Sequence, residues 1–117
     1  MQERRGHIRV KAPVLVEYPH PGSYKTERSF TQDISDTGLR FPTTVKLSIG
    51  QELPLTLRLP FSDTPLQATG EVIWIREVAR HGDTQYEVGL RFRWIEDPDQ
   101  QRLNRFFATL AGPRPRS

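Results

Sequence analysis

The sequence contains no cysteine and no long hydrophobic run. Without cysteine, the chain can form neither a disulfide framework nor a thiolate metal site. A membrane-spanning helix needs about 20 consecutive apolar residues, and no stretch approaches that length. The start, MQERRGHIRV, has basic side chains but no apolar segment after them, unlike a secretory signal. We therefore expect a cytoplasmic protein that does not insert into a membrane.

The usual signatures of an enzyme are also missing. The sequence has no Gly-x-Ser-x-Gly turn, no His-Glu-x-x-His motif and no glycine-rich phosphate loop. His7, His20 and His81 fall in an N-terminal segment and in two expected turns, and no two of them are spaced to share a helical face. The expectation is a protein that is not an enzyme and has neither a metal site nor a resident cofactor.

The net charge of the chain is +3, and its location is more informative than its size. Among the first 11 residues, only Glu3 opposes Arg4, Arg5, Arg9 and Lys11, so this segment accounts for the whole excess. A domain that grips long nucleic acid usually spreads positive charge over a face. The concentrated charge seen here better suits a small anion, so we expect no DNA partner.

Strand periodicity dominates most of the chain. The 10 prolines and 8 glycines indicate short elements joined by many turns. Pro13 lies inside the first expected strand, which is therefore an edge or bulged strand. The same alternation places Trp74 and Trp94 on buried faces. Apolar and polar residues alternate in six segments: 8–18, a second ending near Asp33, a third beginning at Leu39, 53–59, 66–75 and 86–94.

A helical pattern follows at residues 97–111. Asp97 is placed to cap this helix, with Pro98 at the first helical position and Gln100 three residues after the cap. Gly112 and Pro113 then end it. The apolar stripe of the helix consists of Leu103, Phe106, Phe107 and Leu110.

These elements predict an all-β fold with one helix. The economical arrangement is a closed or nearly closed six-stranded antiparallel β-barrel with the helix packed on it. The whole chain, 1–117, forms one domain. Its expected parts are a flexible basic arm at 1–7, the barrel at 8–95, the C-terminal helix and a tail at 112–117.

The first candidate binding motif lies where the basic arm meets the first strand. Arg5 and Arg9 are four residues apart, with Gly6 between them. Because Ile8 is expected to face the core, Arg9 should face outward. A bend at Gly6 would bring Arg5 over the same outer surface. Taken alone, an arginine-rich start also fits a solvated arm.

The second candidate motif is the turn from Asp33 to Gly38. Ile34 is expected to point inward, so Asp33 and Ser35 should flank it and point outward. Gly38 provides either a positive φ or a close backbone approach. Taken alone, this pattern also fits an ordinary Asx-turn.

Together, the two motifs complement a guanine nucleotide. A guanidinium group can hold the O6 and N7 acceptors of guanine with two hydrogen bonds. The Asp33 carboxylate can accept from the N1–H and N2–H₂ donors of the same base. Arg5, Arg9 and the Ser35 hydroxyl suit a phosphate.

These motifs and the later strands resemble the PilZ domain family, the bacterial receptor modules for cyclic di-GMP. The RxxxR motif of that family is matched by Arg5 and Arg9, and its (D/N)xSxxG motif by Asp33, Ser35 and Gly38. The stretches GEVIWI and YEVGLRF resemble the fifth and sixth strands of the family. The resemblance covers nearly the whole chain and implies a six-stranded barrel with a helix.

The resemblance implies a binding module that is not a catalyst. Arg5 and Arg9 would contact phosphate and guanine, Asp33 and Ser35 a guanine edge, and Gly38 would allow close approach. The expected function is a cyclic di-GMP receptor whose basic arm closes over the ligand and which signals to a protein partner.

Arg4 immediately precedes the first motif and adds a third guanidinium group. Cyclic di-GMP carries two negative charges and can self-stack as a dimer, so this extra cation favours two ligands per chain. Two alternatives stay open. One is a small β-barrel that binds nucleic acid through the basic arm, and the other is a PilZ-like interaction domain that binds no ligand.

Overall fold

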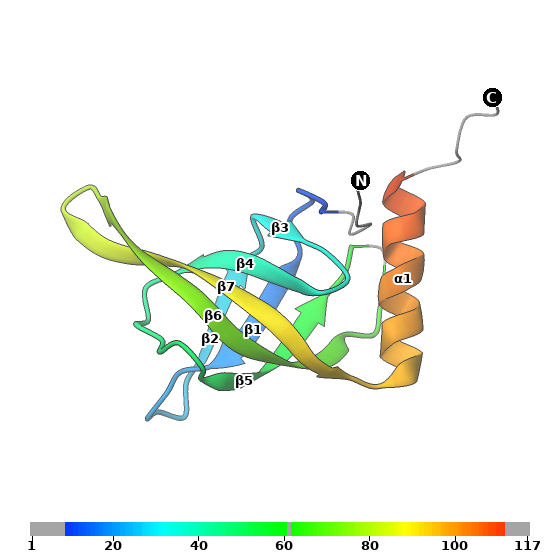
Figure 1. Ribbon diagram of the computed structural model, residues 1–117, viewed down its shortest axis with the longest axis horizontal. Coiled ribbons are helices and arrows are strands. Elements are labelled where there is room, and N and C mark those ends of the chain that lie inside the picture. Colours follow the sequence, from blue (N-terminus) through cyan, green and yellow to red (C-terminus); the bar gives the residue numbers. More distant parts are fainter. Residues whose placement is uncertain (1–8, 61, 112–117) are drawn as a thin grey trace, which may run out of the picture.

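A computed structural model describes residues 9–60 and 62–111 (Figure 1). In this part of the chain, no helix is long and apolar enough to cross a membrane. One antiparallel sheet holds all the named strands, in the order β2-β1-β5-β6-β7-β4-β3. The elements are β1 (Leu15–Pro19), β2 (Thr26–Phe30), β3 (Asp33–Ile34), β4 (Gly38–Thr43), β5 (Glu52–Arg58), β6 (Leu66–Arg80), β7 (Asp83–Ile95) and α1 (Asp97–Ala111).

The sheet is a half-barrel of seven strands, so the expectation of a closed six-stranded barrel is wrong. The single strand expected up to Asp33 divides at Thr31 and Gln32. The Thr31 amide donates to the Val14 carbonyl (2.9 Å), and the Gln32 amide donates to the Arg40 carbonyl (2.8 Å). The chain therefore passes from β2, at one end of the sheet, to β3, at the other end. No ladder among the described residues joins these two end strands.

The first expected strand is shorter than its alternation suggested, because Pro13 has no N–H to donate to a ladder. Before it, Val10 forms an isolated bridge with Ile34 of β3. The amide of each residue donates to the carbonyl of the other, at 2.8 and 2.9 Å. This bridge fixes Arg9 beside β3, although β1 itself lies near the opposite end of the sheet.

Two β-bulges interrupt the long hairpin of β6 and β7. Val72 pairs with Leu90 and Trp74 pairs with Gly89, so Ile73 is an extra residue on β6. In the same way, Phe92 and Trp94 pair with Gly70 and Thr69, which leaves Arg93 as an extra residue on β7. An extra residue reverses the face on which the next side chain points.

The expectation that both tryptophans are buried is therefore wrong. Trp94 is 64% exposed, and Trp74 is only partly buried. Ile75, which follows Trp74, packs against the core instead. Both tryptophans consequently lie on the face of the sheet away from the core.

The core fills the concave side of the half-barrel. The helix contributes to it through Leu103 and Phe107, which are buried, while Phe106 packs against it from the edge. The amide of Gln67 on β6 donates to the Asp99 carboxylate (3.0 Å), which ties the first turn of α1 to the sheet. Leu110, the last member of the predicted stripe, is largely exposed. The largest fully buried side chains are Phe41, Ile34, Leu47, Leu55, Leu57, Leu66, Leu90, Leu103, Val14, Val16, Val72 and Val88.

Candidate functional site

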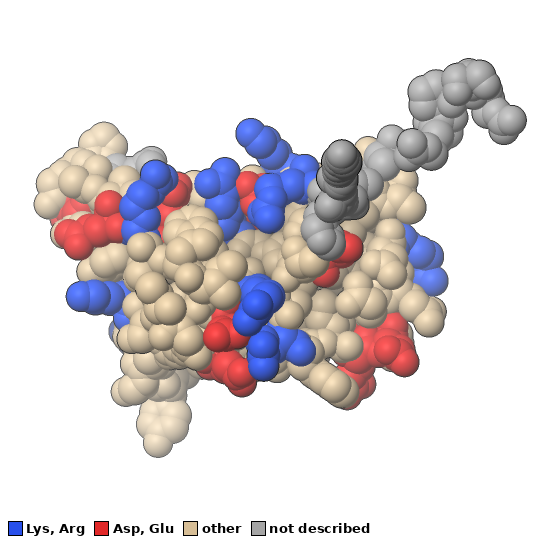
Figure 2. All heavy atoms as spheres, viewed as in Figure 1, with Lys and Arg blue, Asp and Glu red and all other residues tan. Residues whose placement is uncertain are grey.

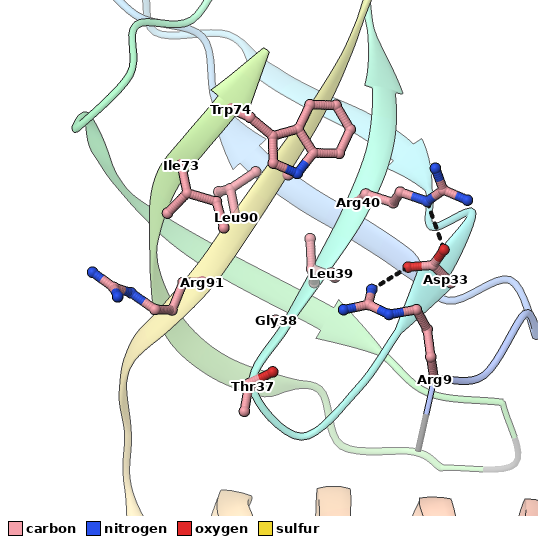
Figure 3. Close-up of a pocket in the computed structure, with 11 residues that line it drawn as sticks. Arg9, Asp33, Thr37, Gly38, Leu39, Arg40, Ile73, Trp74, Leu90 and Arg91 are labelled. Atoms are coloured by element: carbon pink, nitrogen blue, oxygen red, sulfur yellow. Dashed lines mark hydrogen bonds and ion pairs between the residues drawn. The ribbon is translucent and has the colours of Figure 1, made fainter. Parts of the chain in front are cut away.

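A cavity of about 420 Å³ opens on the face of the sheet away from the core. Leu39 and Leu90 point into the core, so their neighbours Arg40 and Arg91 project from the opposite face. Figure 3 shows Arg9 and Arg40 converging on Asp33 at one side of the cavity, with Arg91 on the other side. The lining residues are Arg9, Asp33, Thr37, Gly38, Leu39, Arg40, Ile73, Trp74, Gly89, Leu90 and Arg91.

Asp33 forms an ion pair with two arginines at this cavity. One carboxylate oxygen, Oδ1, lies 2.5 Å from the Arg9 guanidinium, and the other, Oδ2, lies 2.5 Å from Nε of Arg40. Asp33 is only 2% exposed, and each of its carboxylate oxygens is paired with a guanidinium group. The carboxylate does reach the cavity, as its motif predicted, but it is buried between cations rather than open to solvent.

Ser35 is fully buried, so its hydroxyl is not open to solvent as the predicted outward direction implied. Its Oγ accepts from the Thr37 amide (3.2 Å) and lies 3.0 Å from the Thr37 hydroxyl. The Ser35 amide donates to the Gly38 carbonyl (2.8 Å). These bonds close the turn between β3 and β4, and Ser35 is not among the residues that line the cavity. Its role in the free protein is to shape the loop that carries Thr37.

Gly38 satisfies a steric requirement. It is not among the residues with positive φ, so the first of its two predicted reasons does not apply. A Cβ at this position would lie 2.1 Å from the Leu90 carbonyl oxygen. The close backbone approach between β4 and β7 is therefore the reason for glycine here.

Gly89 has a similar role that the sequence analysis missed. A Cβ there would lie 2.2 Å from Nε1 of Trp74, so the indole lies directly against the backbone of β7. Figure 3 shows this indole at the rim of the cavity. The bulge at Ile73 turns Trp74 toward the cavity, and Gly89 gives the ring space to lie there.

Arg40 and Arg91 were also missed as candidate site residues. Arg40 alternates with the buried Leu39 and Phe41, so the sequence alone indicates that it points outward. The sequence does not indicate that Arg40 pairs with Asp33. Arg91 lies 3.0 Å from a Glu71 carboxylate oxygen and is half exposed. Figure 2 shows Lys and Arg side chains on both sides of a hollow on this face.

Fixed charges extend from the cavity wall toward the tip of the β6–β7 hairpin. Gln32, which precedes Asp33, donates a hydrogen bond to the Glu87 carboxylate (2.7 Å). That bond, an ion pair with Arg76 and the positive charge of Arg40 lower the pKa of Glu87, although partial burial opposes them. Arg40 therefore acts on two carboxylates at once.

The described residues bring together three of the six predicted site residues, namely Arg9, Asp33 and Gly38. Arg4 and Arg5 lie outside the described residues. Within the described part of the chain, no group of three or more His, Asp or Glu side chains is arranged to hold a metal ion.

Solved structures with the same fold include three proteins of about 20% identity or less. The inhibitor of motility MotI/DgrA of Bacillus subtilis is 20% identical (TM-score 0.72), and the match covers 97% of this chain and 54% of that one. The complex of K. pneumonia MrkH with c-di-GMP is 19% identical (TM-score 0.76), with 93% and 53% covered. The PilZ domain of YcgR from Escherichia coli with c-di-GMP is 17% identical (TM-score 0.67), with 93% and 92% covered.

This chain thus spans about half the length of MotI/DgrA and MrkH, and nearly all of the isolated YcgR domain. No curated protein matches the sequence. The family model described as "PilZ domain" matches residues 3–109, which include both arginine and aspartate motifs and every strand of the half-barrel. With that match over nearly its whole length, the chain belongs to the PilZ domain family.

Proposed function

We propose that this protein is a receptor for cyclic di-GMP that uses the cavity of about 420 Å³ as its ligand site. The observation that carries the proposal is the convergence of Arg9 and Arg40 on Asp33 beside Trp74 and Arg91. It places cations for phosphate, an acceptor for a guanine edge and an aromatic ring in one hollow. The structures of MrkH and YcgR in complex with c-di-GMP support the choice of ligand.

Each side chain has a distinct role in this proposal. The guanidinium groups of Arg9 and Arg5 hold phosphate oxygens or the O6 and N7 atoms of guanine. Asp33 accepts from guanine N1–H and N2–H₂, either through the carboxylate lone pairs that Arg9 and Arg40 leave open or in place of Arg9 at Oδ1. Ser35 acts through the turn it closes, and Gly38 lets β4 approach β7 closely enough to form the floor of the cavity.

The test is calorimetric titration of the protein with cyclic di-GMP and with single-stranded RNA, each at two salt concentrations. Binding of cyclic di-GMP with little binding of RNA supports the proposal. The alternative of a nucleic-acid-binding barrel requires the reverse, with a steep loss of RNA affinity at the higher salt. Binding of neither would overturn the proposal and leave a protein-interaction domain without ligand.

The number of ligands is a separate expectation. Four phosphate charges in a stacked pair of cyclic di-GMP molecules need more cation than Arg5 and Arg9 supply. Arg4 lies next to Arg5 in sequence, and Arg40 and Arg91 line the cavity. We expect two ligands per chain at saturation in the calorimetric titration. A ratio of one would contradict this stoichiometry without affecting the choice of ligand.

The N-terminal arm is the proposed moving part. Arg9 is the first described residue and lines the cavity, and Arg4 and Arg5 precede it closely in the sequence. Fixing a backbone residue costs about 1–2 kcal/mol, which only strong phosphate and guanine contacts offset. Closure over the ligand would then change the surface offered to a protein partner.

Amide hydrogen exchange tests this arm closure. Residues 2–9 should exchange more slowly with cyclic di-GMP bound than without it, because the ligand gives Arg5 and Arg9 a shared partner. The amide of Val10 is the internal control, since it is already bonded to the Ile34 carbonyl in the free protein. Equal exchange of residues 2–9 in both states would show that the signal is carried elsewhere.

A further inference from the structure

A second hollow adjoins the proposed ligand cavity. It has a volume of about 270 Å³ and lies between the end of β7 and the first turn of α1. Thr37 and Arg91 line both hollows, so the two are adjacent. Gln100 of α1 and Trp94 of β7 form the far part of this second hollow, which we call the Trp94 groove.

Trp94 is presented there by the bulge at Arg93. Without the extra residue, the alternation of β7 would turn the ring toward the core, the side to which Leu90 and Phe92 point. Instead, 64% of the residue is exposed, which is unusual for so large an apolar side chain. An aromatic ring with an open face is the platform on which nucleobases stack.

The charges of the groove suit a base that carries a nearby phosphate. Arg91 and Arg93 both line it, and Arg93 is held only loosely, 3.7 Å from Glu71 and 3.8 Å from Glu52. Asp36 also lines the groove, and its negative charge disfavours a phosphate placed beside it. These charges favour an arrangement in which a purine stacks on Trp94 with its phosphate toward Arg91 and Arg93.

We propose that the Trp94 groove is a second purine-binding site, in which a base of cyclic di-GMP stacks on Trp94. This proposal rests on the proposed function, because the groove shares Thr37 and Arg91 with the cavity assigned to that ligand. The base belongs either to a second ligand molecule or to the other half of the first.

The two tryptophans give a separate probe for each hollow, because the chain contains no others. Protein labelled with 5-fluorotryptophan should show two fluorine resonances, which Trp74→Phe and Trp94→Phe assign. Titration with cyclic di-GMP should shift both resonances. If only the Trp74 resonance shifts, the Trp94 groove binds no base, although the proposed function stands. If neither shifts and calorimetry detects no binding, both proposals are wrong.

Affinity then distinguishes stacking from an indirect effect. Trp94→Ala should weaken cyclic di-GMP binding about fivefold to a hundredfold, the range expected for one lost base–aromatic stack. Trp94→Phe keeps a stacking ring and should stay within about twofold of the parent. Phe30→Ala removes another exposed aromatic, on β2, and is the matched control. Unchanged affinity of Trp94→Ala would overturn the proposal.

The calorimetric ratio identifies the source of the base. A fall from two ligands per chain to one in Trp94→Ala assigns the stacked base to a second molecule. A constant ratio with weaker affinity assigns it to the first molecule.

Discussion

Replacing Arg9 by alanine is expected to weaken cyclic di-GMP binding about tenfold to a hundredfold without unfolding the domain. A lost hydrogen bond to a charged group costs about 1.5–3 kcal/mol. The Arg9 side chain is 54% exposed, and Asp33 keeps its second partner, Arg40, when Arg9 is removed. Arg5→Ala should have a similar effect. Calorimetry gives the affinity, and thermal unfolding shows whether the fold is intact.

Arg58→Ala is a matched control for Arg9→Ala. Glu17 is paired with both Arg58 (3.1 Å) and Arg28 (3.0 Å), so it too is a carboxylate between two arginines. Removing Arg58 therefore makes the same kind of change on β5, away from the residues that line the cavity. It should leave affinity unchanged. If the double variant of Arg5 and Arg9 binds as tightly as the parent, the site is assigned wrongly.

Gly38→Ala is expected to destabilise the fold by about 3 kcal/mol or more, at the upper end of the cost of overpacking. The new Cβ would meet the backbone oxygen of Leu90 at 2.1 Å, and backbone cannot rotate away. The β4–β7 pairing, in which Gly38 opposes Arg91, would have to separate. Urea unfolding of the variant and the parent measures the loss.

Gly89→Ala separates this steric effect from the effect on the ligand site. Its Cβ would meet the Trp74 indole, a side chain that can turn toward solvent. The stability loss should therefore be smaller than in Gly38→Ala, while binding weakens because the ring is displaced. If Gly89→Ala were less stable than Gly38→Ala, a clash with the Trp74 indole would cost more stability than a clash with the Leu90 backbone, which contradicts this prediction.

The spacing of apolar residues along the sequence predicts the strands and the helix well, because each element buries one face and this pattern can be seen within the element itself. Helix α1 occupies the predicted range, and the strands lie within a few residues of their predicted positions, apart from the shortened first strand and the divided second one. The curvature of the sheet was not predictable in this way. It depends on Thr31 and Gln32 bonding to opposite ends of the sheet, through partners distant in sequence.

The site was predicted less completely than the fold. The sequence was sufficient to identify Asp33, Gly38 and Arg9 as candidate site residues, because they belong to short motifs whose side chains suit a nucleotide. The orientations of Trp74 and Trp94 were not, because counting alternate residues assumes an even ladder, and the extra residues at Ile73 and Arg93 break it. The pairing of Asp33 with Arg40 arises from the β3–β4 register, which alternation does not specify.

If the cavity binds cyclic di-GMP as proposed, the ion pair between Arg9 and Asp33 helps to set the ligand concentration at which it fills. A ligand that takes the place of Arg9 at Oδ1 of Asp33 binds only the fraction of molecules in which Arg9 has moved away. The observed affinity is then the intrinsic affinity multiplied by that fraction. Substitutions around Arg9 that strengthen or weaken this ion pair would therefore shift the ligand concentration at half-saturation, without altering any atom that touches the bound ligand.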